Sequence, residues 1–371
     1  MIDTKCYTIE WLESFKKQKE HKVIQTNILE KMIYALHLLE QVKTHGLDFV
    51  FKGGTSLVLL LGEGSRFSID IDIICNVNRE QLESILQLVV KNSKFTSVTL
   101  DERRSYKPGV PKAHYSLEFE SVFNTKVSGK ILLDVLVEDS IYPEHVDSAI
   151  MTKWIDTDER IFVKTPSINA ITGDKLTAFA PNTIGIPYFK GDDSFAMEIC
   201  KQLFDLDRLF NRISNMEIVA SSFQVHAVQE ILYRKYGRSQ KKKDITPGIV
   251  LQDTIDTCLI IMKRDLNKTE PEKSNFKLLQ EGIKAFGTGY LMTGNFRIED
   301  AIIASSKVAY LAAKLLTRDL SPIAYYNGED INSLVIENSE WTFLNKLKRQ
   351  PDKSSFYYWY YTVQLLTVGK K

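Results

Sequence analysis

The chain has 371 residues, more than a single hydrophobic core usually supports, so we expect two domains. Hydrophobic residues make up 44% of the sequence and charged residues 26%, as in ordinary soluble globular proteins. The formal net charge is +1, so any contact with nucleic acid has to come from a local basic patch rather than from the overall charge.

Cysteine usage and hydropathy predict a cytoplasmic protein. The cysteines, Cys6, Cys75, Cys200 and Cys258, are scattered and form neither a CxxC pair nor a zinc-binding spacing. This pattern is typical of a reducing compartment and favours neither a disulfide framework nor a structural metal. The first residues lack the apolar core of a signal peptide, and no stretch approaches roughly 18 uncharged apolar residues. We therefore expect no membrane association.

The part of the chain up to about residue 165 predicts a sheet with helices packed against it. Apolar residues recur at threes and fours in the first long segment, and later segments alternate or form short apolar runs. In chain order, we expect helix within 8–44, a short buried strand in 47–54, a small helix in 55–62, a strand in 68–77, a helix in 79–93, and strands in 97–104, 113–123 and 129–139.

Beyond residue 165 the sequence predicts almost only helices. Helical spacing is found in 167–180, 194–213, 216–237, 249–266 and 298–316. We expect a boundary near 165, with one domain over 1–165 and a mostly helical domain over 166–371. The aromatic segment 354–366 favours packing in a core or an interface over base stacking.

A glycine pair stands between the expected strand at 47–54 and the expected helix after it. Gly53 and Gly54 remove side chains where strand meets helix, which lets a ligand approach the backbone closely. Free amides at the helix start favour phosphate, and Thr55 and Ser56 add hydroxyl donors there. Taken alone, the glycines are equally well explained by the steric needs of a turn.

Paired aspartates follow in the alternating segment "SIDIDIICNV". On a strand, residues two apart share a face, so Asp70 and Asp72 would project side by side. Two carboxylates this close repel unless a cation lies between them, and oxygen ligands suit Mg²⁺. A solvated edge strand is the plain alternative. Asp134, within the apolar segment "KILLDVLVED", is a third acid that a neighbouring strand would bring beside the pair.

These residues resemble a known family. "FKGGTSL" followed by "RFSIDIDI" is similar to the pattern of the AbiEii/AbiGii toxin family of nucleotidyltransferases, which share the core of DNA polymerase beta. The resemblance implies an α+β fold, with a nucleotidyltransferase-type mixed sheet and packed helices in the N-terminal part and a mostly α-helical C-terminal domain. It covers about residues 25 to 210, and the matching residues are Gly53, Gly54, Thr55, Leu57, Arg66, Phe67, Ser68, Asp70 and Asp72.

Two further family motifs fall in the helical part. The lysine of a KLxA helix is matched by Lys175, and an aspartate-leucine helix is matched by Asp205. The sequence departs from the pattern at Gln202, where the family usually has an aspartate. It also lacks an arginine after the KLxA alanine, for which Lys190 is a candidate substitute. Without the resemblance, a surface lysine and an ordinary helix ion pair would be the better interpretation.

The resemblance implies a toxin of a toxin–antitoxin system, active in phage defence by abortive infection, that moves NMP from an NTP to the 3′ end of tRNA. Asp70 and Asp72 would hold Mg²⁺, or Mn²⁺ as the alternative, with Asp134 completing the metal site. Gly53, Gly54, Thr55 and Ser56 would bind the triphosphate. Arg66 and Lys175 would offset charge as pyrophosphate leaves, and Asp205 would hold Lys175 or a substrate amine. A cognate antitoxin encoded nearby is expected, with or without direct contact.

Two other functions stay open at the level of the sequence. The same chemistry could modify a small hydroxyl compound or a protein side chain, which needs no RNA path. A catalytically silent nucleotide-binding protein is the third hypothesis, favoured only by Gln202. The basic run 233–244, which includes Arg234 and Lys241 to Lys243, could follow an RNA backbone, although a solvated loop between helices is the more common use of such a run.

Overall fold

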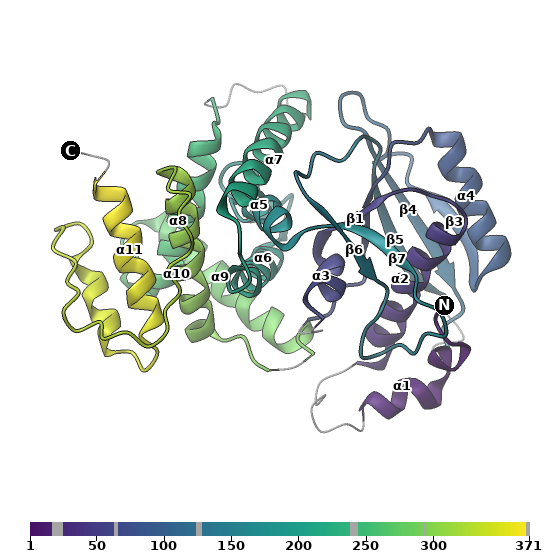
Figure 1. Cartoon of the computed structure of the whole chain (residues 1–371), viewed down its shortest axis with the longest axis horizontal. Helices are drawn as coiled ribbons and strands as arrows, with labels where there is room; N and C mark the ends of the chain where they lie inside the picture. Colours follow the sequence, from purple (N-terminus) through teal and green to yellow (C-terminus); the bar gives the residue numbers. More distant parts are fainter. Residues whose placement is uncertain (17–24, 63–65, 124–127, 238–243, 293, 369–371) are drawn as a thin grey trace. The chain divides into compact units, whose positions relative to one another are not determined.

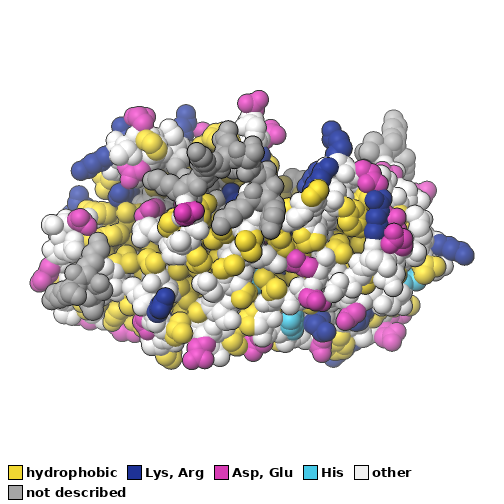
Figure 2. Space-filling view, turned by 90° about the horizontal axis from the view of Figure 1, so that it is seen from above, with side chains coloured by type: hydrophobic (Ala, Val, Ile, Leu, Met, Phe, Trp, Pro, Cys, Tyr) yellow, Lys and Arg dark blue, Asp and Glu magenta, His cyan; other side chains and the backbone are white. Residues whose placement is uncertain are grey.

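The computed structural model describes residues 1–16, 25–62, 66–123, 128–237, 244–292 and 294–368. The chain divides into two compact units. Unit 1 consists of Met1–Ser167 with Gly289–Asn295, and unit 2 consists of Ile168–Thr288 with Phe296–Lys371. Acidic and basic side chains are interspersed over the face shown in Figure 2, as expected for a net charge near zero.

Unit 1 is built on a seven-stranded mixed sheet (Figure 1). The strand order is β3-β4-β5-β2-β1-β7-β6. The pairs β5–β2 and β1–β7 are parallel and the other neighbours are antiparallel. The strands are β1 (Val50–Lys52), β2 (Ile71–Ile74), β3 (Phe95–Leu100), β4 (Lys112–Phe119), β5 (Gly129–Leu136), β6 (His145–Ala149) and β7 (Phe162–Pro166).

Helices bury one face of this sheet. α2 contacts both β5 and α4, and α4 contacts β3. The central strands turn alternate residues into this core: Phe51, Ile71, Ile73, Leu133 and Val135 are at most 2% exposed. The residues between them lie on the opposite, more open face. The helical elements of unit 1 are η1 (Thr4–Tyr7), α1 (Ile9–Lys16), α2 (Thr26–Thr44), α3 (Gly53–Leu61) and α4 (Arg79–Asn92).

The regular secondary structure described in unit 2 is helical apart from a short hairpin. α5 packs against α6 and α7, and α10 packs against α6, α8 and α11. Its elements are α5 (Ile168–Ala178), β8 (Phe189–Lys190), β9 (Asp193–Ser194), α6 (Ala196–Phe210), α7 (Met216–Gly237), α8 (Pro247–Lys263), η2 (Arg264–Leu266), α9 (Glu270–Gly289), α10 (Ile298–Leu316), η3 (Thr342–Arg349) and α11 (Ser354–Val368).

The aromatic segment of α11 forms core, as the sequence predicts. Phe356, Tyr357, Tyr358 and Trp359 are all buried. The ring of Tyr358 packs against Phe210 of α6, with ring centroids 5.2 Å apart. These rings therefore join α11 to the rest of unit 2 and are not available for base stacking.

The observed elements differ from the predicted ones at several points. β2 begins at Ile71, so Asp70 precedes the strand rather than sharing it with Asp72. β6, β7 and α9 have no counterpart among the predicted segments. The four cysteines are buried and free. Among the described residues, none of the helices is both long enough and apolar enough to span a bilayer.

Candidate active site

Four polar side chains form one row across four neighbouring strands of unit 1. Lys52 on β1 is the register partner of Asp72 on β2, and Asp72 is the partner of Asp134 on β5. Asp134 is in turn the partner of His114 on β4. Register partners share a face of the sheet, and this row lies on the face opposite the core. The prediction that a neighbouring strand places Asp134 beside Asp72 is thus confirmed.

Gly53 provides space for the carboxylate of Asp72. This glycine begins α3 with a φ of +75°, and a Cβ built on it would lie 2.1 Å from Oδ2 of Asp72. Atoms that are not bonded cannot approach so closely, and a side chain is strained at this φ. Only glycine therefore allows the strand-to-helix turn and the Asp72 carboxylate to lie against each other.

The hydroxyl groups after the glycines are used inside the protein. Thr55 donates to the backbone carbonyl of Asp70 at 2.6 Å and lies 2.8 Å from the hydroxyl of Ser68. Ser56 donates to the carbonyl of Gly53 at 2.9 Å. Both side chains are buried. They fix the start of α3 against the segment that carries Asp70, whose own side chain is exposed.

Arg66 is buried against the second glycine. A Cβ on Gly54 would lie 2.4 Å from an η nitrogen of Arg66, so the guanidinium occupies the space above the helix start. Only 7% of Arg66 is exposed. Its backbone pairs with Leu291, and the amide of Phe67 donates to the carbonyl of Tyr290 at 2.7 Å. Tyr290 and Leu291 thus support the backbone at Arg66 and Phe67 from a distant part of the sequence.

His114 belongs to this row, although no sequence pattern predicts a role for it in the site. Its Nδ1 lies 2.7 Å from Oδ1 of Asp134. The side chains are 17% and 41% exposed, so the pair lies on the open face of the sheet rather than inside the core. An isolated histidine in the sequence gives no signal of this contact, because it depends on the register between β4 and β5.

The carboxylates fit Mg²⁺ as a pair rather than as a closed cluster. Within the ranges that the structure describes, no group of three or more His, Cys, Asp or Glu side chains is arranged to hold a metal ion. Asp72 and Asp134 are nevertheless in register, and the missing side chain of Gly53 leaves Asp72 room. Mg²⁺ commonly takes one or two carboxylates and completes its shell with water and substrate phosphates. The donor set is therefore suitable for Mg²⁺ whose remaining ligands are water molecules or the phosphates of an NTP.

In unit 2, Lys175 and Asp205 form a buried ion pair. Nζ of Lys175 lies 2.7 Å from Oδ2 of Asp205, and their side chains are 6% and 3% exposed. The same Nζ donates to Oε1 of Gln202 at 3.0 Å. Of the two partners predicted for Asp205, Lys175 or a substrate amine, the structure shows the contact with Lys175. Gln202, the departure from the family pattern, still supplies an oxygen acceptor to the lysine.

The other basic residues predicted to contact substrate are Lys190 and the basic run 233–244. Lys190 is exposed on β8, with Nζ 4.4 Å from the ring centroid of Phe195. Arg234 donates to the carbonyls of Thr183, Ile184 and Gly185 at 2.6–2.8 Å, so its guanidinium fixes a backbone turn. Most of the basic run after it, with Lys241 to Lys243, lies outside the described residues.

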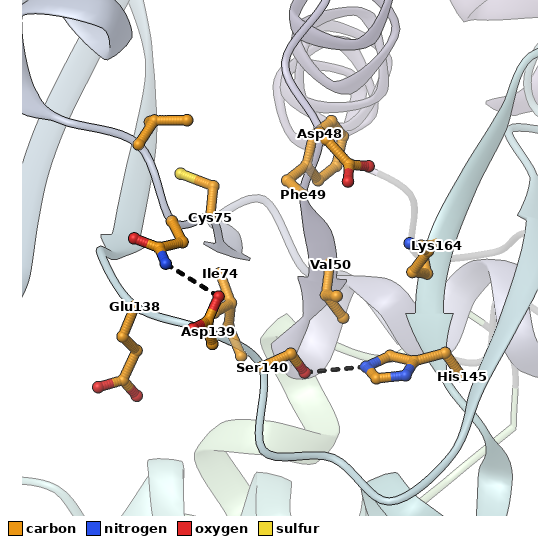
Figure 3. Close-up of a pocket in the computed structure, with 12 residues that line it drawn as sticks. Asp48, Phe49, Val50, Ile74, Cys75, Glu138, Asp139, Ser140, His145 and Lys164 are labelled. Atoms are coloured by element: carbon orange, nitrogen blue, oxygen red, sulfur yellow. Dashed lines mark hydrogen bonds between the residues drawn. The ribbon is translucent and has the colours of Figure 1, made fainter.

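Unit 1 also contains a cavity of about 360 Å³ at the other end of β1 and β2 (Figure 3). None of the predicted site residues lines it. Within it, Ser140 Oγ lies 2.8 Å from Nε2 of His145. Burial, together with the charge of Lys164, lowers the pKa of His145. Burial raises the pKa of Cys75 to about 12, so this thiol stays protonated at neutral pH. The polar lining gives no specific indication of a ligand.

Comparison with protein families decides the relationship. The model of the family described as "Nucleotidyl transferase AbiEii toxin, Type IV TA system" matches residues 37–288, more than half of the chain. The chain belongs to the AbiEii family. The match includes the glycine turn, the paired aspartates, Asp134, Lys175 and Asp205. A search of the curated proteins found no match.

Two solved structures of nucleotidyltransferases are similar to this chain. MenT4, a nucleotidyltransferase toxin from Mycobacterium tuberculosis, is 14% identical, with a TM-score of 0.50 over 84% of this chain and 89% of that one. A proposed nucleotidyltransferase from H. pylori is 17% identical, with a TM-score of 0.33 over 68% of this chain and 95% of that one. The similarity to MenT4 shows the fold, and the α+β class predicted from the sequence is confirmed.

Membership of the AbiEii family establishes the general activity. The protein is a nucleotidyltransferase toxin that uses an NTP, and its family implies an antitoxin. The roles of the individual site residues stay predictions.

Proposed function

We propose that the protein transfers NMP from an NTP to the 3′ end of tRNA in the cytoplasm, with Mg²⁺ or Mn²⁺ as cofactor, and thereby inhibits growth. The observation that carries this proposal is the register of Asp72 and Asp134 directly beside the glycine turn. Carboxylates and a helix start on one sheet face provide what phosphoryl chemistry needs, namely oxygen ligands for a cation and amides for phosphate.

In this proposal, Asp72 and Asp134 are the pair of metal ligands on the sheet, and Asp70, from the segment before β2, is the third ligand. The bound cation would neutralise phosphate charge and activate the attacking hydroxyl. Gly53 and Gly54 place the first amides of α3 at the carboxylates, where the positive end of the helix dipole favours the triphosphate. Thr55, Ser56 and Arg66 contribute by holding this turn in place, because their polar groups are buried against it.

Lys175, held by Asp205, would offset the negative charge of the departing pyrophosphate. A lysine offers a compact positive charge that can meet a phosphate oxygen, and the carboxylate of Asp205 orients this lysine by accepting a hydrogen bond from its Nζ. Gln202 accepts a second hydrogen bond from Nζ, which restricts the lysine further. The role of unit 2 in binding the acceptor is part of this proposal, as is the cognate antitoxin, which need not bind the toxin directly.

The acceptor can be tested with labelled nucleotides. Each NTP, labelled at the α-phosphate, is incubated with the protein, Mg²⁺ and total tRNA, and label in RNA is measured. A parallel reaction uses tRNA whose 3′-terminal diol has been oxidised with periodate. The proposal predicts label in intact tRNA from at least one NTP and none in oxidised tRNA. Equal labelling of both would place the acceptor elsewhere, and no labelling from any NTP would contradict a tRNA acceptor.

A further inference from the structure

The ring of His114 makes a hydrogen bond to the carboxylate of Asp134. A carboxylate oxygen accepts hydrogen bonds, so we assign the donor in this contact to an N–H at Nδ1 of His114. The hydrogen bond engages Oδ1 and leaves Oδ2 as the second acceptor. Nε2 of His114 has no hydrogen-bond partner among the described residues.

The backbone of His114 is held separately from its ring. Its amide donates to the hydroxyl of Ser105 at 2.9 Å, and its carbonyl accepts from the amide of Asp101 at 2.8 Å. Ser105 is 4% exposed, so this contact is shielded from water. The loop after β3 therefore fixes β4 beyond the end of its pairing with β3, at the residue that faces Asp134.

The contact between His114 and Asp134 affects how the carboxylates of Asp72 and Asp134 are oriented. Asp72 and Asp134 are register partners, and two adjacent negative charges tend to rotate away from each other in the absence of a cation. Gly53 leaves room for the carboxylate of Asp72, and His114 holds the carboxylate of Asp134 by a hydrogen bond. Carboxylates that bind metals are themselves commonly oriented by hydrogen bonds from such neighbours.

We propose that His114 is a positioning residue, whose Nδ1–H holds Oδ1 of Asp134 so that Oδ2 stays directed toward a divalent cation bound with Asp72. This inference rests on the proposed metal site. His114 does not touch the reacting groups itself. It acts by fixing the orientation of one carboxylate before the cation binds.

Manganese binding tests this without any turnover. Free Mn²⁺ is titrated with the full-length protein and followed by electron paramagnetic resonance, with no NTP present. His114→Leu removes the donor and should raise the Kd for Mn²⁺ by about tenfold. His114→Asn, whose amide nitrogen takes the place of Nδ1, should stay within about threefold of wild type. His145→Leu is the matched control, since it removes a histidine of the same sheet that bonds only Ser140 among the described residues, and it should leave the Kd unchanged.

The outcomes separate this proposal from the metal site itself. If wild type binds Mn²⁺ and both His114 variants bind it equally well, His114 has no positioning role, although the metal site stands. If His114→Asn is as weak as His114→Leu with unchanged melting temperature, the hydrogen bond at Nδ1 is not the cause and the proposal is overturned. If wild type binds no Mn²⁺ and Asp72→Ala behaves the same way, the metal site fails and the role of His114 fails with it.

Discussion

At Gly53, the missing side chain leaves space that the carboxylate of Asp72 occupies. Gly54 does the same for the guanidinium of Arg66. At the level of the sequence, the glycine pair is explained either by close approach of a ligand or by the steric needs of a turn. The structure adds a further reason, because two side chains of the protein itself lie where β-carbons would be. The pair is therefore needed to assemble the site as well as to open it.

Gly53→Ala tests this role, with Gly62→Ala as its control. Both glycines have positive φ, +75° and +63°, so both variants should lose about 1–2 kcal/mol of stability from backbone strain. Only at Gly53 would the new methyl meet Asp72, since nothing lies within 4 Å at Gly62. We expect Gly53→Ala to lower the NMP transfer rate by about 100-fold, as for a misplaced catalytic group. Gly62→Ala should retain most of the activity in the same assay.

The two variants are compared by melting temperature and by label transfer. Equal loss of activity in both would mean that backbone strain, rather than the contact with Asp72, determines the effect. Full activity in Gly53→Ala would contradict the proposed position of Asp72 in the site.

At the residue scale, the sequence predicted the acids but not their neighbour. Alternation within each segment places Asp72 and Asp134 opposite buried residues, so both can be identified from one-dimensional patterns. The partner of Asp134 could not be identified in this way. His114 reaches it through the register of two antiparallel strands, which no local pattern in either segment specifies.

Helices α5 and α6 meet at the pair of Lys175 and Asp205. A buried ion pair is weak evidence for stability, since desolvation offsets much of the attraction, but losing one partner leaves an uncompensated charge. Replacing either residue alone should therefore destabilise the contact between these two helices, whether or not the lysine takes part in catalysis.

Lys175→Met should lower the free energy of unfolding by about 3–5 kcal/mol, because Asp205 stays buried without its cation. The double variant Lys175→Met with Asp205→Leu should recover much of that loss. Lys307→Met is the control. Lys307 of α10 pairs with Asp207 of α6 at 2.8 Å, but this pair is more exposed, so the loss of stability should be smaller. Chemical denaturation measures all three variants.

Activity separates structure from catalysis at this pair. If Lys175 serves the pyrophosphate, the double variant should be stable and inactive. A double variant that is both stable and active would show that the pair has only a structural role.

At the element scale, the central strands and most helices follow from periodicity, whereas β6 and β7 do not. β6 lies at the sheet edge, and Val146 within it is 40% exposed beside the exposed Asp147, so the usual alternation is missing. β7 carries an exposed Phe162 and ends at Pro166. Both strands are defined by pairing with neighbours, a tertiary property that overrides weak local signals.

On the scale of the whole chain, unit 1 is completed by a segment that follows α9. Leu291 and Met292 are 3% and 2% exposed, and Met292 belongs to the core of unit 1. Tyr290 accepts the amide hydrogen of Phe67, next to Arg66. A polypeptide that ended at about residue 210, where the sequence resemblance ends, would lack this support.

Met292→Ala should destabilise unit 1 by about 2–5 kcal/mol, as for other large-to-small core substitutions. Hydrogen exchange should accelerate in peptides that contain Phe67, because the backbone bond to Tyr290 depends on this segment. Asn295→Ala, at an exposed position of the same segment, should change stability by less than about 0.5 kcal/mol. Unchanged exchange at Phe67 in Met292→Ala would show that the segment is dispensable.

Expression of the protein should slow bacterial growth, and this toxicity should depend on the paired aspartates. Asp70→Ala and Asp72→Ala each remove a proposed metal ligand, and ligands that act as a unit cannot replace one another. Growth curves after induction, with soluble protein compared by immunoblot, measure the effect. Inhibition by equally soluble aspartate variants at the wild-type level would separate toxicity from this site.

The central claim is that Asp72 and Asp134 form the active site. The rate of NMP transfer in Asp72→Asn and Asp134→Asn tests it most directly. These substitutions keep the size of each side chain and remove its charge, so the fold should be retained, as melting temperatures would confirm. Loss of several kcal/mol of transition-state stabilisation corresponds to a decrease of about 10³-fold in rate. We predict a decrease of this order for both variants at saturating NTP and Mg²⁺. Transfer at the wild-type rate by folded Asp72→Asn would contradict the assignment of the active site.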